Sequence, residues 1–409
     1  MDVFHLFSVL IVLSAGFAYI NFRYLKLPST IGLMLVSLVF SLFILVFGNY
    51  FPDFKRDITA TMYNINFSEL LLEGMLSFML FAGAIHIKSK DLNNEKLSIL
   101  LFSTISVLIS TFLIGFASYY VLTFMGFKID LIHSILFGAL ISPTDPISVL
   151  SILKNTGISK SLETIIAGES LFNDGVAVVV FITLLKSASP GANLDAISIM
   201  MLFGQEAIGG LILGLIVGYI GFKFIASIDH YQVEVLITLA IVMGGYTLAH
   251  YLHVSGPLAM VVAGLITGNQ GKTLGMSDIT ARYVDGFWEL IDEILNALLF
   301  VLIGLELLVI QTNQKILIAA FIILVITLIT RYISIFIPSI SVQLKEKITQ
   351  KTRLILTWGG LRGGISIALA LSINPEYHKE IWVTITYVIV CFSILVQGLT
   401  IGKFAKKMQ

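Results

Sequence analysis

Charged residues and cysteine are scarce in this sequence of 409 residues. Asp, Glu, Lys and Arg make up 12% of it, against about 25% in an ordinary soluble domain, which argues against a soluble fold. The formal net charge is zero, so the basic surface that nucleic-acid binding requires is missing. The single cysteine, Cys391, excludes a disulfide within the chain. Its apolar surroundings favour packing over redox chemistry.

Hydrophobic residues are abundant instead, at 57% of the chain. They form apolar stretches of about 20 residues, the length that crosses a bilayer as a helix. We therefore predict an all-α polytopic membrane protein, with residues 1–409 forming a single integral membrane transporter domain of about 13 transmembrane helices. The predicted spans begin near Val3, Pro28, Phe67, Leu97, Leu131, Leu162, Ile197, Tyr231, Ser255, Phe287, Ile316, Arg353 and Glu380.

The orientation of these spans follows from the loops that hold Lys and Arg, because cytoplasmic loops retain basic residues. Most of the 25 basic residues fall in the loops that are cytoplasmic if the N-terminus is outside. We therefore predict a multi-pass protein of the cell (inner) membrane with its N-terminus outside and its C-terminus in the cytoplasm. The first apolar stretch lacks a basic segment and a cleavage site, which predicts a retained helix rather than a signal peptide.

Two of the predicted spans contain residues that disfavour a continuous helix. The fifth contains Pro143-Thr144-Asp145-Pro146, and each proline removes a backbone donor and clashes with the preceding turn. The twelfth contains Gly-Gly-Leu-Arg-Gly-Gly at residues 359–364, where the glycines permit unwinding and close helix approach. Either interruption alone could be an ordinary kink. Together, in the two halves of the chain and each with a charge, they indicate the binding site of a transporter.

The sixth span carries several polar side chains within two helical turns. A carboxylate at the centre of a span costs about 2.5–3.5 kcal/mol, so such residues persist where they line a cavity or have a partner. A spacing of four residues places Ser170 and Asp174 on one face of the helix. The same spacing places Glu169 and Asn173 on the adjacent face.

The fifth and sixth spans together could form a cation site. Asp145, Asp174, the Ser170 hydroxyl and a carbonyl near Thr144 would supply only oxygen ligands, which suit a hard cation such as sodium. Proton and cation would compete for the same carboxylate oxygens. Competition at one site that opens alternately to each side is sufficient for obligatory exchange.

Arg362 in the twelfth span needs a counter-charge, because arginine stays protonated and a charge within the bilayer needs a partner. We expect this partner to be Glu169, in a structural pair that holds the twelfth span to the sixth. Glu306 and Arg331 also lie within spans, but no motif surrounds them. For these two side chains we expect packing or extension toward the membrane interface.

These three motifs, residues 144–146, 168–175 and 359–364, resemble the signature of NhaP-type sodium/proton antiporters. The resemblance covers nearly the whole chain and implies a 13-helix fold with inverted repeats and two broken crossing helices. It also implies a homodimer, in which a core of ion-binding spans moves against a dimerisation domain. The core would comprise spans about 97–190 and 316–405, and the dimerisation domain spans about 1–90 and 231–310.

The resemblance also assigns roles to individual residues of this chain. Asp145 and Asp174 match the cation and proton carriers, and Thr144 and Ser170 match further ligands of the transported Na+. Asn173 matches a supporting residue. The Asn-Asp sequence at 173–174 resembles that of electroneutral exchangers, since relatives with two aspartates there tend to be electrogenic. Glu169 and Arg362 match the buried ion pair of the family.

One position departs from the pattern of the family. Some members have a glutamate after the Leu-Phe of the third span, where this chain has Ala82. An accessory ligand that acts through water is therefore missing here, which affects the expected ion affinity and selectivity.

Three other functions compete with sodium/proton exchange, in which lithium could replace sodium. A potassium/proton antiporter would use the same oxygen ligands, and the sequence does not separate the two. A passive channel needs a continuous pore with repeated weak sites. A single carboxylate cluster beside two interrupted helices fits alternating access better. An intramembrane aspartyl protease would have a Gly-x-Gly-Asp motif around its second aspartate. The residues before Asp174 in this chain do not form that motif, so we predict no enzyme activity. We expect no cofactor; the partners are the cation, the proton, membrane lipid and a second copy of the chain.

Overall fold

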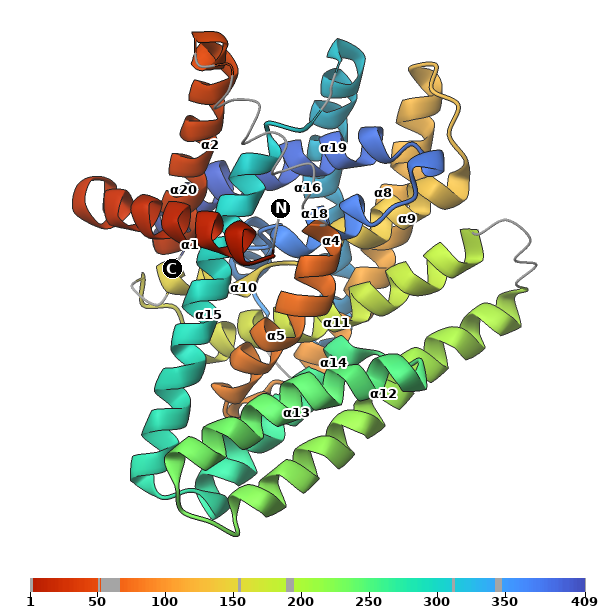
Figure 1. Cartoon of the computed structure of the whole chain (residues 1–409). Helices are drawn as coiled ribbons and strands as arrows, with labels where there is room; N and C mark the ends of the chain where they lie inside the picture. Colours follow the sequence, from red (N-terminus) through yellow and green to blue (C-terminus); the bar gives the residue numbers. More distant parts are fainter. Residues whose placement is uncertain are drawn as a thin grey trace.

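A computed structural model describes residues 3–50, 52, 67–153, 156–188, 195–310, 313–342 and 348–408 of the chain. Within these ranges every regular element is a helix (Figure 1), which confirms the predicted all-α class. The helices of ten or more residues are α1 (Val3–Ile20), α2 (Ser29–Phe47), α5 (Leu76–Ile85), α8 (Ile105–Phe124), α9 (Leu131–Ile141), α11 (Lys160–Ala188), α12 (Ala196–Ile225), α13 (Tyr231–Leu252), α14 (Gly256–Ile266), α15 (Asp278–Glu306), α16 (Gln314–Val342), α19 (Lys379–Phe392) and α20 (Gly398–Met408). The shorter ones are α4 (Phe67–Glu69), α6 (Ser89–Asn94), α7 (Lys96–Ser103), α10 (Pro146–Leu153), α17 (Gln350–Trp358) and α18 (Gly364–Leu371).

Several of these helices continue into segments with a different helical winding. Four segments are π-helical: Asn21–Leu25, Leu70–Met75, Thr267–Gly275 and Ser393–Gln397. Two short segments, Gly48–Tyr50 and Pro375–Tyr377, are 3-10 helices. The π-helical segments extend or join α-helices, so that Phe67–Ile85 and Lys379–Met408 each form one long span.

Nine helical stretches in the described ranges are long and apolar enough to cross a membrane. They are Phe7–Leu25, Ser29–Phe47, Phe67–Ile85, Lys96–Phe124, Lys160–Ala188, Ile197–Ile225, Tyr231–Leu252, Gln314–Ser341 and Lys379–Met408, which correspond to nine of the predicted spans. The other four predicted spans coincide with α9–α10, α14, α15 and α17–α18. Of these, α9–α10 and α17–α18 are interrupted, α14 is short, and α15 carries several carboxylates. The protein is thus a multi-pass membrane protein, and the count of about 13 spans stays a prediction.

Polar side chains at the first residues explain where several helices begin. Ser255 accepts a hydrogen bond from the backbone N–H of Leu258 at the start of α14. Ser277 caps α15 and Thr349 caps α17 in the same way. Such caps satisfy backbone donors that have no partner within the helix, so the boundaries follow from the local sequence.

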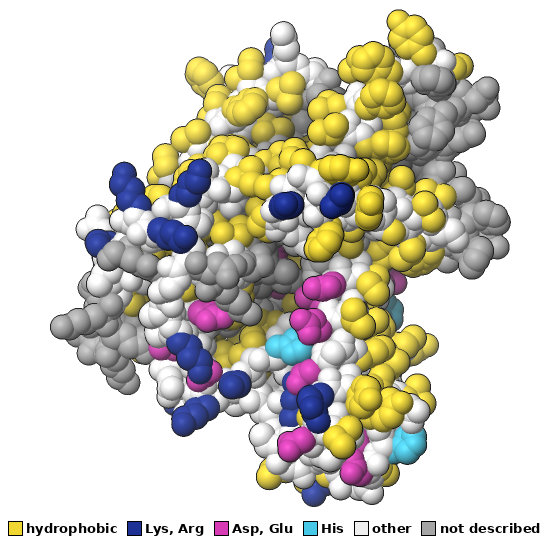
Figure 2. Space-filling view, turned by 90° about the vertical axis from the view of Figure 1, so that its left-hand side faces the viewer, with side chains coloured by type: hydrophobic (Ala, Val, Ile, Leu, Met, Phe, Trp, Pro, Cys, Tyr) yellow, Lys and Arg dark blue, Asp and Glu magenta, His cyan; other side chains and the backbone are white. Residues whose placement is uncertain are grey.

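The outer helices expose large apolar side chains, as expected of a surface that contacts lipid. On α12, Ile208, Leu211, Ile212 and Leu215 are exposed at the spacing of one helix face. Figure 2 shows one side of the molecule, whose upper part is largely hydrophobic; most of the Lys, Arg, Asp and Glu side chains visible there lie at mid-height or below. On this side of the molecule, the charged side chains therefore lie mainly outside the hydrophobic upper part.

Helix α11 lies at the centre of the molecule. In Figure 1 it lies between α12–α14 at the bottom and the group α8, α9, α16 and α19 at the upper right. It packs against α7, α9, α12 and α14, and 78% of its most apolar stretch is buried inside the protein. This helix carries Glu169, Ser170, Asn173 and Asp174, so the polar residues of the sixth predicted span face protein rather than lipid.

Candidate ion-binding site

The proline-containing interruption of the fifth predicted span is present in the structure. Helix α9 ends at Ile141, α10 begins at Pro146, and residues 142–145 between them are not helical. The hydroxyl of Ser142 lies 2.7 Å from the carbonyl oxygen of Gly138, to which it donates a hydrogen bond. The unwound segment leaves the carbonyl groups of Ser142 and Pro143 without helical partners, so they need donors from elsewhere.

The glycine-rich interruption of the twelfth predicted span is also present, and it lies against the first one. Helix α17 ends at Trp358, α18 begins at Gly364, and the intervening segment is not helical. The backbone N–H of Asp145 donates to the carbonyl of Leu361 over 2.7 Å. A Cβ on Gly363 would lie 2.8 Å from the Cβ of Asp145, so only glycine permits this approach.

Arg362 supplies the donors that the first interruption needs. Its Nη1 donates to the carbonyl of Pro143 at 2.9 Å and also to that of Ser142. Its own backbone N–H donates to the hydroxyl of Ser393 at 2.8 Å. Arg362 is 3% exposed, and it therefore joins the two interruptions by hydrogen bonds inside the protein.

A cluster of hydrogen bonds attaches the first interruption to α11. The Oγ1 atom of Thr144 lies 3.0 Å from the Oγ of Ser170. The Asn173 amide nitrogen donates to Thr144 Oγ1 at 2.8 Å, and the Thr144 backbone N–H donates to Asn173 Oδ1 at 3.4 Å. All three side chains are buried. The structure thus brings together the three residues that the sequence analysis placed around the two aspartates.

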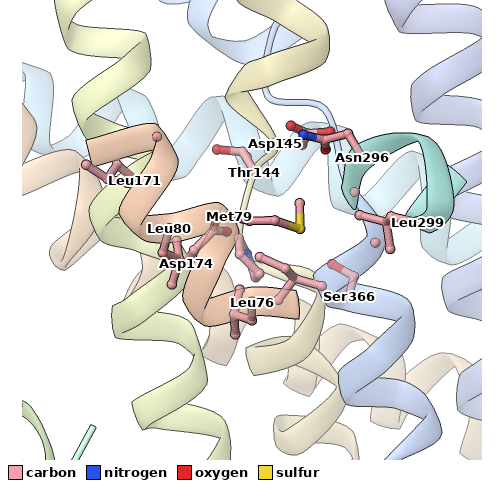
Figure 3. A pocket seen from close by; sticks show the side chains of 15 residues that line it. Leu76, Met79, Leu80, Thr144, Asp145, Leu171, Asp174, Asn296, Leu299 and Ser366 are labelled. Carbon is pink, nitrogen blue, oxygen red and sulfur yellow. The ribbon is translucent and has the colours of Figure 1, made fainter. Parts of the chain in front are cut away.

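Asp145 and Asp174 line the same cavity, which has a volume of about 70 Å³ (Figure 3). Thr144 lines this cavity too, whereas Ser170 and Asn173 contact Thr144 from behind it. Asp174 is buried, and Asp145 is partly buried. A cavity of this size holds a few water molecules. Two carboxylates and a hydroxyl thus face a space that fits a small cation with part of its hydration shell.

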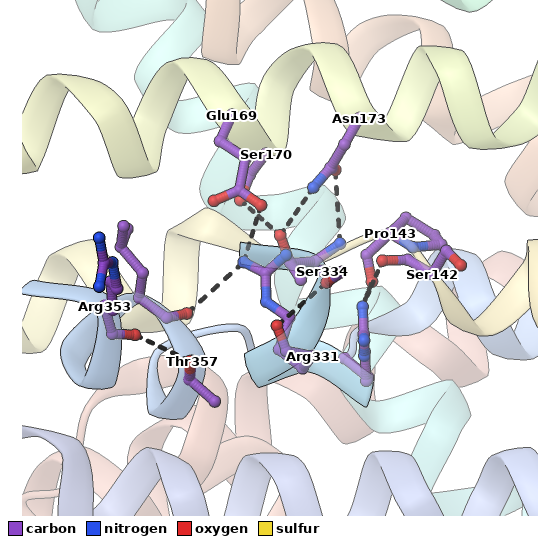
Figure 4. A network of polar contacts seen from close by, with 12 residues as sticks. Ser142, Pro143, Glu169, Ser170, Asn173, Arg331, Ser334, Arg353 and Thr357 are labelled. Atoms are coloured by element: carbon purple, nitrogen blue, oxygen red, sulfur yellow. Dashed lines mark hydrogen bonds and ion pairs between the residues drawn. The ribbon is translucent and has the colours of Figure 1, made fainter. Parts of the chain in front are cut away.

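The predicted ion pair between Glu169 and Arg362 is wrong. The structure pairs Glu169 with Arg331 on α16, with 2.7 Å between Glu169 Oε1 and Arg331 Nη2 (Figure 4). Glu169 and Arg331 are 2% and 4% exposed, so Arg331 is packed inside the protein, and the alternative of an extension toward the membrane interface is wrong. Arg331 and Arg362 line one small cavity. The sequence contains two intramembrane arginines, Arg331 and Arg362, but gives no distances that show which of them pairs with Glu169.

Helix α15 contributes residues that the sequence analysis did not single out. Asn296 lines the cavity of the two aspartates. Its amide donates to the carbonyl and the carboxylate of Asp292 at 2.8 and 3.0 Å. Asn296 and Asp292 also line a neighbouring cavity of about 480 Å³ beside α1 and α2. The spacing of four residues between these two polar groups, at the start of the apolar half of α15, is the signal that could have revealed them.

Two interrupted helices that meet beside carboxylates deep within a multi-pass membrane protein define a secondary transporter, since irregular backbone at this depth occurs where it lines a binding cavity. The comparisons with known proteins agree. The family model described as sodium/hydrogen exchanger, transmembrane, matches residues 9–407. The chain belongs to this family of transporters, which are not enzymes, and the transported ions are substrates rather than cofactors.

Similar proteins cover the chain almost completely. The chain is 47% identical to the Na(+)/H(+) antiporter NhaP of Pseudomonas aeruginosa over 409 residues, with 98% of this chain and 96% of that protein covered. It is 35% identical to the Na(+)/H(+) antiporter NhaH of Halobacillus dabanensis, with coverage of 100% and 98%. The solved structure of the sodium proton antiporter MjNhaP1 from Methanocaldococcus jannaschii at pH 8 matches with a TM-score of 0.80 at 20% identity, covering 100% of this chain and 99% of that one. The fold is therefore that of this antiporter.

Proposed function

We propose that this protein is a secondary active antiporter that exchanges Na+ for H+ across the cell membrane. The observation that carries the proposal is the shared cavity of Asp145 and Asp174 at the meeting point of two interrupted helices. The names of the similar proteins support sodium as the cation, and none of those cited above refers to potassium. The potassium alternative therefore has no support, whereas lithium, which resembles sodium in its preference for oxygen, remains an ion to test.

The proposed cycle depends on competition for the carboxylates. Na+ binds the oxygens of Asp145 and Asp174 with Thr144 and Ser170 as further ligands, and protons displace it from the same oxygens. The hydroxyl of Thr144 already lines the cavity. The hydroxyl of Ser170 lies 3.0 Å from it and must turn toward the cavity to reach the ion. The site opens alternately to each side of the membrane, so each ion crosses only in exchange for the other.

We further propose that exchange is electroneutral. Asn173 lies next to Asp174 in the sequence, and its amide donates a hydrogen bond to Thr144. An amide neither gains nor loses a proton during transport. The aspartate pair then takes up one proton for each Na+ that it releases, so that no net charge crosses the membrane. Glu169, Arg331 and Arg362 support the site, since their charges and hydrogen bonds hold α11, α16 and the interrupted helices together.

The remaining parts of the proposal concern the whole molecule. The protein lies in the cell membrane with its N-terminus outside and its C-terminus in the cytoplasm, as the distribution of basic residues indicates. It forms a homodimer surrounded by lipid. Residues about 97–190 and 316–405 form the moving core, and residues about 1–90 and 231–310 form the dimerisation domain.

A transport assay in proteoliposomes tests the proposal. A fluorescent pH probe inside the vesicles reports proton movement when sodium, lithium or potassium is added outside, between about pH 6 and 9. We expect sodium to drive proton movement in the wild type and Asp174→Asn to abolish it. Asp195→Asn is the matched control, because Asp195 is an exposed helix cap and asparagine caps a helix equally well. Loss of transport in both variants, or no response to any cation in the wild type, would contradict the proposal.

A further inference from the structure

The turn between α1 and α2 holds two basic side chains beside a cavity that the proposed transport cycle does not use. This cavity has a volume of about 630 Å³, and Arg23 and Lys26 line it. Apolar side chains, among them Phe22 and Leu33, form another part of its wall. The cavity thus combines positive charge with a hydrophobic surface.

Neither basic side chain forms an ion pair with an acidic side chain of the described residues. In the part of the chain that the structure describes, no ion pair involves Arg23 or Lys26. Both side chains are exposed. Two unpaired cations that line one cavity attract an anion that can enter it.

The backbone of the turn is held in one conformation, so the two cations are presented together. The side chain of Asn21, which is 6% exposed, donates to the carbonyl of Leu27 at 3.0 Å and accepts from its N–H at 3.2 Å. The N–H of Lys26 donates to the Asn21 carbonyl at 2.7 Å, and Lys26 itself has a left-handed conformation with φ of 54°. A Cβ on Gly32 would collide with Asn21, so α2 packs closely on this turn.

The place of the turn in the membrane identifies the class of anion. The turn connects the spans Phe7–Leu25 and Ser29–Phe47, so it lies where phospholipid head groups meet the acyl chains. Phe22 and Tyr24 beside it are 84% and 71% exposed, as is typical of aromatic residues at a membrane interface. The turn belongs to the side of the molecule seen in Figure 2, where basic side chains stand near hydrophobic ones.

We propose that the α1–α2 turn binds the phosphate group of an anionic membrane phospholipid between Arg23 and Lys26, while its acyl chains contact the apolar wall of the cavity. The neighbouring cavity has the opposite charge, since Asp292 and Glu293 line it. The two cavities share Ala18, Ser29 and Leu33. These carboxylates repel the phosphate from the shared wall, which leaves the basic end as the place where it binds.

Native mass spectrometry of the detergent-purified protein tests this proposal without depending on transport. Wild type is titrated with dioleoylphosphatidylglycerol or with dioleoylphosphatidylcholine, which has the same chains and no net charge. We expect one phosphatidylglycerol to bind more tightly than phosphatidylcholine. Because each basic residue near a membrane surface strengthens binding about fivefold, Arg23→Gln with Lys26→Gln should weaken it roughly 25-fold.

Two further variants control for charge and folding. Lys88→Gln with Lys90→Gln removes the same number of charges from exposed positions that do not line the cavity, and it should leave phosphatidylglycerol binding unchanged. Arg23→Lys with Lys26→Arg keeps both charges and should bind like the wild type. Equal binding of the two lipids, or an equal loss in the Lys88/Lys90 variant, would overturn the proposal. Displacement of the lipid by millimolar inorganic phosphate would also overturn it, in favour of a site for free anions.

Discussion

Glu169 on α11 and Arg331 on α16 form a buried ion pair, 2.7 Å apart, directly beside the interrupted helices. A Cβ on Gly360, in the second interruption, would lie 2.5 Å from Arg331 Nε. The pair therefore lies between α11, α16 and the glycine-rich segment, and its removal affects all three elements.

The first prediction concerns the stability of this pair. Arg331→Met leaves the Glu169 carboxylate buried without its partner, which costs about 3–5 kcal/mol of folding free energy. The double variant with Glu169→Gln as well should regain a large part of that loss, because no lone charge remains. Thermal unfolding in detergent measures both effects. Asp91→Asn breaks the partly exposed pair of Asp91 with Lys160 and should change stability by about 1 kcal/mol or less.

The second prediction concerns the contact of Gly363 with Asp145. Gly363→Ala places a methyl group 2.8 Å from the Asp145 Cβ, which must displace the carboxylate from the cavity. We expect the KM for sodium to rise about tenfold or more, with the protein still folded. Gly16→Ala is the matched control, since its added Cβ has nothing within 4 Å. An unchanged KM in Gly363→Ala would show that the position of Asp145 does not determine sodium binding.

Voltage dependence provides a third prediction. If Asn173 keeps exchange electroneutral, the transport rate of the wild type should not change when a potassium gradient with valinomycin sets the membrane potential. Asn173→Asp replaces a hydrogen-bond donor to Thr144 by a group that can carry a charge, so its rate should become voltage-dependent. A voltage-dependent wild type would refute electroneutral exchange while leaving antiport intact.

The fourth prediction concerns Asp292 in the larger cavity beside the site. Its carboxylate accepts a hydrogen bond from Asn296, which lines both cavities. Asp292→Asn should lower the local concentration of cations and raise the KM for sodium several-fold at low ionic strength, with a smaller effect at high ionic strength. Glu289→Gln removes an equal charge from an exposed position on the same helix outside both cavities. If both variants behave alike, the cavity has no particular part in sodium access.

Local chemistry made the interruptions predictable from the sequence. Proline at 143 and 146 and the glycines between 359 and 364 disfavour a helix wherever the chain places them, and the structure has non-helical segments at both positions. Helical spacing likewise placed Ser170, Asn173 and Asp174 within one region of α11. These predictions needed only residues that are close in the sequence.

The errors and omissions concern contacts between distant parts of the chain. Glu169 pairs with Arg331 and not with Arg362, although both arginines are buried. The choice depends on how α16 packs in three dimensions, which the sequence does not reveal. Arg362 instead donates to the backbone of residues 142 and 143, and carbonyl acceptors carry no signature in a sequence. The spacing of Asp292 and Asn296 could have marked them as polar partners, but their contact with the cavity of the two aspartates arises only on folding.

The hydrogen bonds between the two interruptions also limit how the protein can move. The bonds from Asp145 to Leu361 and from Arg362 to Pro143 join the interrupted helices, and the bonds between Thr144 and Asn173 join them to α11. Mechanically, these bonds oppose a hinge between the three segments at the aspartates. If the three segments move as one body in the proposed cycle, Asp145 and Asp174 change their exposure to water together. A cross-link that fixes any one of the segments to an outer helix should then stop the movement of both.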